Sequence, residues 1–293
     1  MAIVNVNEHL MQLTKAESRD MRIGKILVDS GKITHIDAER IWSLQKIEGL
    51  RFGVAAEKLG VIAQSEIRRV LSLQFDYPYL QANQSGFSKD LVAAYQPFSP
   101  QVEALRGLRS QLNARFFSEA NKSLAIISPN VGEGCSNLAA NLAVVFSQLG
   151  ERTLLIDANL RDPCQHKIFN LEEPLGLSDI LVGRADLDVA TKIEPFPYLT
   201  VLGAGTIPPN PQELLSRYVF TDFMEQVAGF YDVIIVDTAP AVANSDAQTV
   251  AARCGGALLV SRLNKTRTSE LENVRDQLVV TGVNIVGAVL NDF

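Results

Sequence analysis

A ten-residue stretch, SPNVGEGCSN at residues 128–137, has the composition of a loop that holds phosphate. Its two glycines let the backbone turn N–H groups inward toward an anion at the start of a helix. Ser136 stands where such a loop carries the hydroxyl that binds Mg²⁺, whereas Cys135 occupies the position of the lysine that pairs with the β and γ phosphates. We therefore predict a nucleotide site that lacks its principal cation, formed by Gly132, Glu133, Gly134, Cys135, Ser136 and Asn137.

Two carboxylates are placed to act with this loop. Asp157 and Asp237 each end an apolar run, TLLID and YDVIIVD, of the kind expected of buried parallel strands. Because parallel strands end at one edge of a sheet, we expect both carboxylates beside Ser136, where the three residues would bind Mg²⁺. If the site transfers phosphate, Asp157 and Asp237 are its predicted catalytic residues.

The elements that must position these residues alternate along the chain. The loop is predicted to run into an amphipathic helix at residues 138–149. Strands are predicted at residues 123–128, 153–157, 198–205, 231–237, 256–262 and 285–291. This alternation predicts an α/β fold with a doubly wound, mostly parallel sheet that binds its ligand at the carboxyl ends of the strands.

The cysteines and the overall composition narrow the chemistry. Cys135, Cys164 and Cys254 lie far apart without a CxxC pair, so they predict neither a disulfide framework nor a zinc cluster, and the last two are interpreted as incidental thiols. A catalytic Cys135 is an alternative, because a helix N-terminus lowers the pKa of a thiol, but no histidine lies near it in the sequence.

The net charge and the hydropathy of the chain limit its partners and location. The net charge of −6 argues against nucleic acid as a partner. Without a signal peptide or a run of ~20 apolar residues, a cytoplasmic location is expected.

The first third of the chain contains an internal repeat. Residues 22–45 and 51–74 match at an arginine, two glycines, an isoleucine and a closing Ser-Leu-Gln, so each copy is predicted to be a helix, a glycine stop and a second helix. Arginine can grip phosphate with two hydrogen bonds, and glycine lets a ligand approach the backbone closely. Two related copies therefore suit a two-fold anionic ligand, and a purely structural or docking module is the alternative.

The sequence changes character after the repeat. A helical domain, a Pro/Gly/Ser-rich linker and the α/β domain are predicted at residues 1–80, 81–100 and 101–293. Residues 101–120 predict a helix in which Glu103, Arg106 and Arg109, spaced by three, lie on one side and are available to a partner surface.

The α/β domain resembles the BY-kinases, the bacterial tyrosine-kinase branch of the MinD/ParA P-loop ATPases. The likeness runs from Glu103 to the end and rests on EALRGLR, the loop, LLIDANLR, PPNPQELL, VIIVDTAP and SDAQTV in that order. It implies ATP or ADP with Mg²⁺ as cofactors and a homo-oligomer formed through Glu103, Arg106 and Arg109. It also implies a role in exopolysaccharide synthesis or export, with the protein peripheral at the inner membrane on the cytoplasmic end of a polysaccharide co-polymerase. A partitioning ATPase of the wider ParA class is disfavoured by EALRGLR and PPNPQELL.

Several residues depart from that family's pattern. Cys135 replaces the lysine, Asn159 replaces the second carboxylate of the DxDxR element, and Asn137 replaces the usual threonine. The family's tyrosine-rich tail is also missing, because Tyr231 is the last tyrosine. These changes predict a degenerate, catalytically impaired domain. The alternative is an active tyrosine autokinase or ATPase that controls polysaccharide chain length, in which Arg161 or a lysine of a neighbouring subunit replaces the missing cation.

The repeat resembles the N-terminal domain of type II secretion ATPases, the MshE N-terminal family, whose tandem motifs bind cyclic di-GMP. The resemblance implies that polar and glycine positions frame this ligand: Arg22, Gly24, Gly31, Gln45, Arg51, Gly53, Gly60 and Gln74. It implies an apolar lining of Ile23, Leu27, Ile33, Phe52 and Ile62. The second copy has Ala56 and Glu57 where the first has larger apolar residues, and Glu57 would repel an anionic ligand. The two resemblances together predict a cyclic di-GMP-responsive regulator that acts by binding and assembly.

Overall fold

The computed structural model describes residues 23–63, 66–67, 78–80, 86–172 and 175–293. The chain divides into two compact units, Met1–Pro78 and Tyr79–Phe293. Each unit has its own hydrophobic core and is described by itself. Arg22 and Gln74, which were predicted to frame a ligand, lie outside the described residues.

The first unit is helical. Residues 23–29 form a helix, followed by α2 (His35–Glu48) and α3 (Phe52–Lys58). In each copy of the repeat the first helix is followed, two residues after its end, by a glycine with positive φ, 67° at Gly31 and 62° at Gly60. The residue after each glycine donates its N–H to a carbonyl five residues earlier, so the same turn closes both copies. The sequence repeat is thus also a repeat of backbone conformation.

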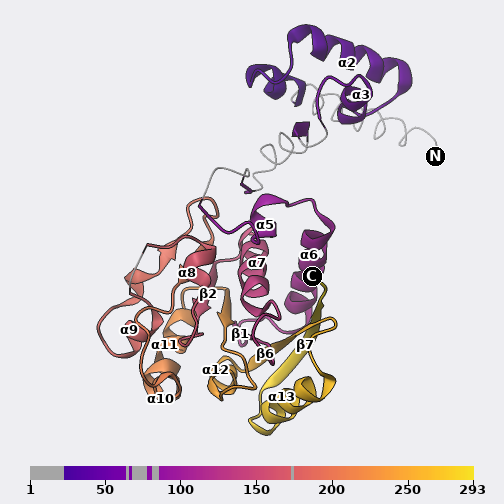
Figure 1. Ribbon diagram of the computed structural model, residues 1–293. Coiled ribbons are helices and arrows are strands. Elements are labelled where there is room, and N and C mark those ends of the chain that lie inside the picture. The colour runs from indigo at the N-terminus through magenta and orange to yellow at the C-terminus, as the bar shows by residue number, and fades with distance from the viewer. Residues whose placement is uncertain (1–22, 64–65, 68–77, 81–85, 173–174) are drawn as a thin grey trace, which may run out of the picture. The chain divides into compact units, whose positions relative to one another are not determined.

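The second unit is a layered α/β structure (Figure 1). Seven strands of the described chain form one sheet in the order β3-β4-β2-β5-β1-β6-β7. They are β1 (Ser123–Ile127), β2 (Thr153–Asp157), β3 (Thr191–Lys192), β4 (Leu199–Leu202), β5 (Val233–Asp237), β6 (Gly256–Arg262) and β7 (Asn284–Asn291). All neighbours are parallel except β3, which pairs antiparallel with β4. The predicted doubly wound, mostly parallel sheet is confirmed, and the two-residue β3 is too short to show a period in the sequence.

Helices cover both faces of the sheet because alternate residues of its strands point to opposite sides. One face packs against α5 (Val92–Tyr95), α6 (Pro100–Arg115), α7 (Cys135–Ser147) and α8 (Gln165–Ile168). The other packs against α9 (Leu177–Leu181), α10 (Pro211–Ser216), α11 (Tyr218–Ala228), α12 (Asp246–Cys254) and α13 (Thr268–Val280). A short 3₁₀ helix, η1 (Leu187–Val189), precedes β3. No helix of the described chain is both long and apolar enough to cross a bilayer.

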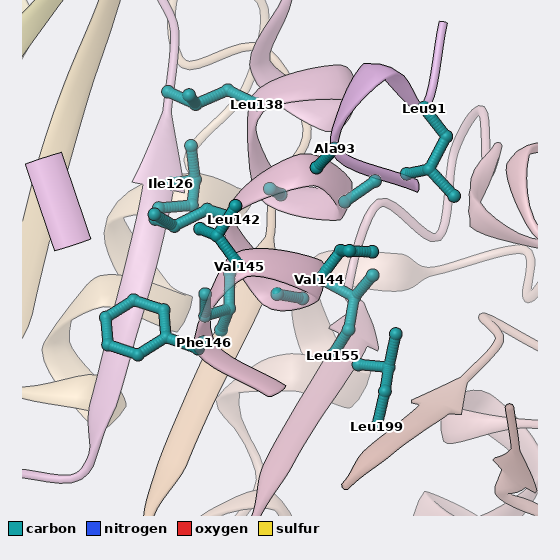
Figure 2. Packing of buried hydrophobic residues seen from close by; sticks show 14 of the residues in the cluster. Leu91, Ala93, Ile126, Leu138, Leu142, Val144, Val145, Phe146, Leu155 and Leu199 are labelled. Carbon is teal, nitrogen blue, oxygen red and sulfur yellow. The ribbon is translucent and has the colours of Figure 1, made fainter. Parts of the chain in front are cut away.

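Helix α7 is the centre of the first face. In Figure 2, Leu142 and Val145 point toward Ile126 of β1, whereas Leu91 and Ala93 lie on the other side of the helix. Almost every residue of α7 is buried, so the helix is enclosed rather than amphipathic. It also begins three residues earlier than predicted, at Cys135, because Gly134 of the loop is itself the N-cap.

Most of the segment predicted as a linker belongs to the α/β unit. Helix α5 within this segment packs on α7, and Leu91, Ala93 and Ala94 are fully buried. Asn141 of α7 holds the segment, because its side chain accepts from the N–H of Ala93 at 2.8 Å and donates to the carbonyl of Asp90 at 3.0 Å. A buried amide in an apolar helix makes these bonds across almost fifty residues, which local composition cannot reveal.

Helix α6 is shorter than predicted. It begins at Pro100, capped by the Ser99 hydroxyl, and ends at Arg115 rather than at residue 120. Phe116 leaves the helix because its ring is buried over Gly256, where an added Cβ would lie 2.3 Å from the ring. A tertiary contact therefore overrides the local helical pattern.

Candidate functional site

The predicted phosphate loop connects β1 to α7. Gly132 (φ 73°) and Gly134 (φ 88°) both have left-handed backbone conformations, which L side chains rarely adopt. Such conformations are compatible with a loop whose N–H groups turn toward an anion. A cavity of about 260 Å³ opens at the loop. Its walls are Ser128, Asn130, Val131, Gly132, Glu133, Gly134, Cys135, Ser136, Asn137, Asn159, Asp162, Cys164, Thr238 and Pro240.

Cys135 does not present a reactive group to this cavity. Its Sγ donates to the carbonyl of Ile126 on β1 at 3.2 Å, and the residue is 8% exposed. Burial raises the pKa of the Cys135 thiol well above its usual value, and the charge of Asp237 raises it further. Desolvation thus outweighs the helix N-terminus, which leaves a neutral thiol where the loop pattern has a cation and disfavours the nucleophile alternative.

The two predicted carboxylates meet at the carboxyl edge of the sheet. Asp157 and Asp237 are direct partners in the register of β2 and β5, and both are fully buried. Burial and the charge of Asp237 raise the pKa of Asp157 to about 8. Burial raises the pKa of Asp237 to about 6, against hydrogen bonds from Gln165, Ser136 and Cys135. In the part of the chain that the structure describes, neither carboxylate forms an ion pair.

Gln165 connects the carboxylates to the loop. Its Nε2 donates to Asp237 Oδ2 at 2.8 Å and to the carbonyl of Ser136 at 3.1 Å, and its backbone N–H donates to Asp157 Oδ2 at 2.9 Å. Two buried oxygens here, Asp237 Oδ1 and Gln165 Oε1, accept no hydrogen bond from the described residues. The sequence analysis missed Gln165, since an amide eight residues after a strand has no pattern of its own.

Arg161, which the sequence offered as a substitute cation, is held elsewhere. Its guanidinium bonds to Asp246 at the start of α12 through Nε at 2.7 Å and Nη2 at 3.1 Å. The Asp246 side chain is only 1% exposed, so the pair anchors the loop after β2 to α12. Asn159, in the position of the missing carboxylate, bonds within the same loop to the carbonyl of Asp162 at 2.8 Å.

Two other cations contact the phosphate loop, Arg262 from the end of β6 and Lys265 from the turn that follows. Lys265 Nζ donates to the carbonyls of Val131 at 2.7 Å and Gly132 at 3.2 Å. Arg262 Nη1 donates to the carbonyl of Gly132 at 3.1 Å, and its guanidinium lies 4.2 Å from the centre of the Phe293 ring. Sequence reasoning missed both, because they lie about 130 residues from the loop in the sequence.

Glu133 and Asn137, predicted among the nucleotide-binding residues, have different surroundings. Glu133 is fully buried and accepts from the backbone N–H of Asn130 at 2.9 Å and the hydroxyl of Thr266 at 2.6 Å. Its side chain therefore stabilises the loop. Asn137 is exposed on the cavity wall, and its carbonyl accepts from Asn141.

Two of the glycines and all the apolar residues predicted around cyclic di-GMP lie at helix contacts of the first unit. The core contains the predicted apolar lining: Ile23, Leu27, Ile33, Phe52 and Ile62. A Cβ on Gly24 would lie 2.9 Å from the Trp42 ring, and one on Gly53 would lie 3.1 Å from Ile67. These glycines therefore allow close helix packing.

The remaining described positions of that set lie nearer the surface. Arg51 and the turn glycines Gly31 and Gly60 are exposed, whereas Gln45 is half-buried and donates to the carbonyl of Leu50 at 3.3 Å. The structure thus leaves Arg51 and the two glycine turns accessible to a ligand.

The charged trio of α6 is engaged within the chain. Arg106 bonds to Glu103 on the same helix, and Arg109 Nη1 donates to the carbonyl of Val145 at 2.6 Å. Glu103 remains 64% exposed. Arg109 therefore joins α6 to the end of α7.

Comparisons with known proteins agree with this geometry. A scan against protein-family profiles finds no match. Over 207 residues, 71% of its length, the chain is 35% identical to the tyrosine-protein kinase YwqD of Bacillus subtilis and spans 87% of that protein. Over 206 residues, 69% of its length, it is also 35% identical to a Klebsiella pneumoniae protein of the cps region, described as a tyrosine-protein kinase, but spans only 28% of it.

A solved structure is similar as well. The kinase domain of the Escherichia coli tyrosine kinase ETK superposes with a TM-score of 0.67 at 33% sequence identity. The match covers 74% of this chain and 85% of the ETK domain.

Proposed function

The chain belongs to the family of bacterial tyrosine-protein kinases, and we propose that it is a cyclic di-GMP-responsive regulator of exopolysaccharide synthesis or export. In this proposal its kinase-like unit is catalytically impaired and acts through assembly. The observation that carries the proposal is the thiol of Cys135, buried and bonded to the Ile126 carbonyl where a loop of this kind has its lysine.

The loss of that lysine bears directly on phosphoryl transfer. Such transfer depends on positioning the phosphates and on neutralising the charge that develops on them. A neutral thiol cannot do this, and Arg161 is occupied by Asp246. The same site places two buried carboxylates side by side without an ion pair in the described chain, which repels a polyanionic nucleotide unless a metal ion accompanies it.

The residues present do fit Mg²⁺. Asp237 Oδ1 is a buried acceptor without a partner, and Ser136, Asp157 and Asp237 would hold the ion. When bound, Mg²⁺ would supply charge neutralisation for the phosphates of ATP or ADP. The N–H groups of Gly132 and Gly134 would hold those phosphates. Weak nucleotide binding without efficient transfer is the expected behaviour.

Assembly is the output that we propose for this unit. The relative from a cps region supports a role in polysaccharide production. We propose a homo-oligomer formed with the exposed Glu103 side of α6, docked on the cytoplasmic end of a polysaccharide co-polymerase. The protein would then be cytoplasmic and peripheral at the inner membrane through that partner.

Cyclic di-GMP is the proposed input. Two copies of one glycine turn, at Gly31 and Gly60, support a ligand with two equivalent halves. Arg51 is the first residue of the second copy and is exposed, so its guanidinium is accessible to phosphate or to a purine.

An ATP-turnover assay tests catalytic impairment. We expect purified wild-type chain with ATP and Mg²⁺ to give no ADP or phosphotyrosine above background. The double variant Cys135→Lys/Asn159→Asp restores the family's cation and carboxylate, and we expect it to raise turnover at least roughly 100-fold. Circular dichroism confirms that the variant folds. Wild-type turnover that Asp237→Ala abolishes would contradict the proposal.

An active autokinase or ATPase is the second candidate, and one contact favours it. Lys265 Nζ lies 2.7 Å from the Val131 carbonyl, so a cation already touches the loop. If this lysine replaces the missing one, turnover exists in the wild type and Lys265→Ala removes it. The exposed Lys192 supplies the matched control, Lys192→Ala.

A further inference from the structure

A cluster of metal-binding atoms lies at the end of β2 and β5. One carboxylate oxygen each of Asp157 and Asp237 and the Sγ of Cys164 lie within 4.8 Å of one another. Cys164 is fixed beside the carboxylates because its backbone N–H donates to Asp157 Oδ2 at 2.9 Å. Asp157 ends β2, Asp237 ends β5, and Cys164 lies in the loop directly before α8.

The cluster lacks a positive charge to balance its two carboxylates. Asp157 and Asp237 are fully buried partners in the strand register and have no ion pair in the described chain. Asp237 Oδ1 and the neighbouring Gln165 Oε1 are buried acceptors to which no described residue donates a hydrogen bond. Buried oxygens of this kind cost free energy unless a donor or a cation satisfies them. The orphaned acceptors therefore point to a bound cation.

The donor set selects the kind of cation. Mg²⁺ prefers six oxygen ligands in an octahedral arrangement, whereas a thiolate with two carboxylates suits Zn²⁺ or Co²⁺. Cys164 is half-buried on the wall of the 260 Å³ cavity, which gives an ion a path from solvent. A fourth position can be filled by water.

We propose that Asp157, Cys164 and Asp237 bind a thiophilic divalent cation, Zn²⁺ foremost, in the absence of nucleotide. This goes beyond the proposed function, because the site needs neither phosphate nor cyclic di-GMP. It also gives Cys164 a role that its position in the sequence, far from the other cysteines, did not indicate.

Cobalt titration of the full-length, nucleotide-free chain tests the proposal. Co²⁺ bound to a thiolate gives a charge-transfer absorption in the near ultraviolet, and Zn²⁺ should displace it whereas excess Mg²⁺ should not. We expect Cys164→Ser to abolish the band and to weaken Zn²⁺ binding at least roughly 100-fold, as loss of a direct ligand should exceed the effect of losing an outer-shell partner. Asp237→Asn should weaken binding similarly.

Another cysteine of the chain provides the control. The variant Cys254→Ser removes a buried thiol at the end of α12 and should retain the band and the zinc-induced rise in melting temperature. Circular dichroism checks the fold of each variant. Absence of the band in wild type, its survival in Cys164→Ser, its loss in Cys254→Ser, or its displacement by Mg²⁺ would each overturn the proposal.

Discussion

The pair of buried carboxylates is the feature that most shapes the site at the scale of single residues. Asp157 and Asp237 lie side by side. Cys135, whose thiol is neutral, occupies the loop position at which the sequence pattern predicts a lysine. The negative charge of the carboxylate pair must therefore be neutralised by protons, by metal ions or by a bound complex of nucleotide and metal. Each of these has a measurable effect on stability.

The carboxylate pair predicts how stability depends on pH. Both groups have folded-state pKa values above the ordinary 3.8, about 8 for Asp157 and about 6 for Asp237, because burial disfavours their charged forms. A raised carboxyl pKa stabilises the folded state fully below about pH 4, and that contribution is lost as pH rises through the folded-state values. The free energy of unfolding should therefore fall between about pH 4 and about pH 8, and Asp237→Asn should reduce the fall by a few kcal/mol.

Urea unfolding at several pH values in metal-free buffer measures this dependence. Asp188→Asn, a change at an exposed carboxylate, serves as the matched control and should leave the pH profile as in wild type. An identical profile for Asp237→Asn and wild type would show that the pair is not the source.

Residue identity predicted part of the site well. Asp157 and Asp237 were found from the apolar runs before them, and Gly132 and Gly134 from the loop pattern, because strand and loop impose these positions locally. The partner of Arg161 is 85 residues away and the groups around Cys164 come from two strands, so no local pattern contains them. These contacts are made between segments that are far apart in the sequence, so only the folded structure identifies them.

At the scale of elements, Asn141 explains how the segment before α6 becomes part of the α/β unit. Its amide makes three bonds to backbone groups from within an otherwise apolar helix. Asn141→Ala would leave the buried N–H of Ala93 without an acceptor.

We expect Asn141→Ala to lower the free energy of unfolding by about 1–3 kcal/mol, the cost of an unsatisfied buried polar group. Chemical denaturation followed by far-ultraviolet circular dichroism measures the change. Gln111→Ala on the exposed side of α6 should stay within about 0.5 kcal/mol of wild type. Equal stability of the two variants would mean that the segment is held by apolar contacts alone.

The glycine turns of the repeat predict a second element-scale effect. Gly60 has a φ of 62°, so Gly60→Ala should destabilise the first unit by about 1–2 kcal/mol. Steric contact is not the cause, since apart from the adjacent residues no described residue lies within 4 Å of the added Cβ. Trp42, the only tryptophan of the sequence, packs in that unit and reports its unfolding by fluorescence.

Gly107→Ala tests whether the effect comes from backbone conformation. Gly107 lies within α6 with open space around it, so alanine there should be neutral or stabilising and should not alter the Trp42 transition. A Gly60→Ala transition that coincides with wild type would rule out strain at the turn.

Elements with continuous apolar runs were predicted closely, whereas those defined by tertiary contacts were not. The parallel strands matched because a buried strand needs an apolar run of limited length. The end of α6 at Arg115 and the packing of residues 86–100 depend on Phe116 and Asn141 finding partners far along the chain. From composition alone, residues 86–100 were predicted to be part of a linker.

At the scale of the whole molecule, the chain joins a helical unit with a duplicated turn to a kinase-like unit whose loop has Cys135 at the position where the sequence pattern predicts a lysine. The first unit supplies the proposed input and the second the proposed assembly surface. In this account signalling does not require ATP hydrolysis, so ligand binding is the property to measure.

Isothermal titration calorimetry of the full-length chain with cyclic di-GMP tests the central claim most directly. We expect micromolar or tighter binding and an affinity roughly tenfold or more weaker for Arg51→Ala, as expected for loss of a charge-assisted contact. Arg40→Ala, at an arginine of α2 with a 61% exposed side chain, should bind as wild type. No heat at high protein concentration, together with no shift in melting temperature, would contradict the account.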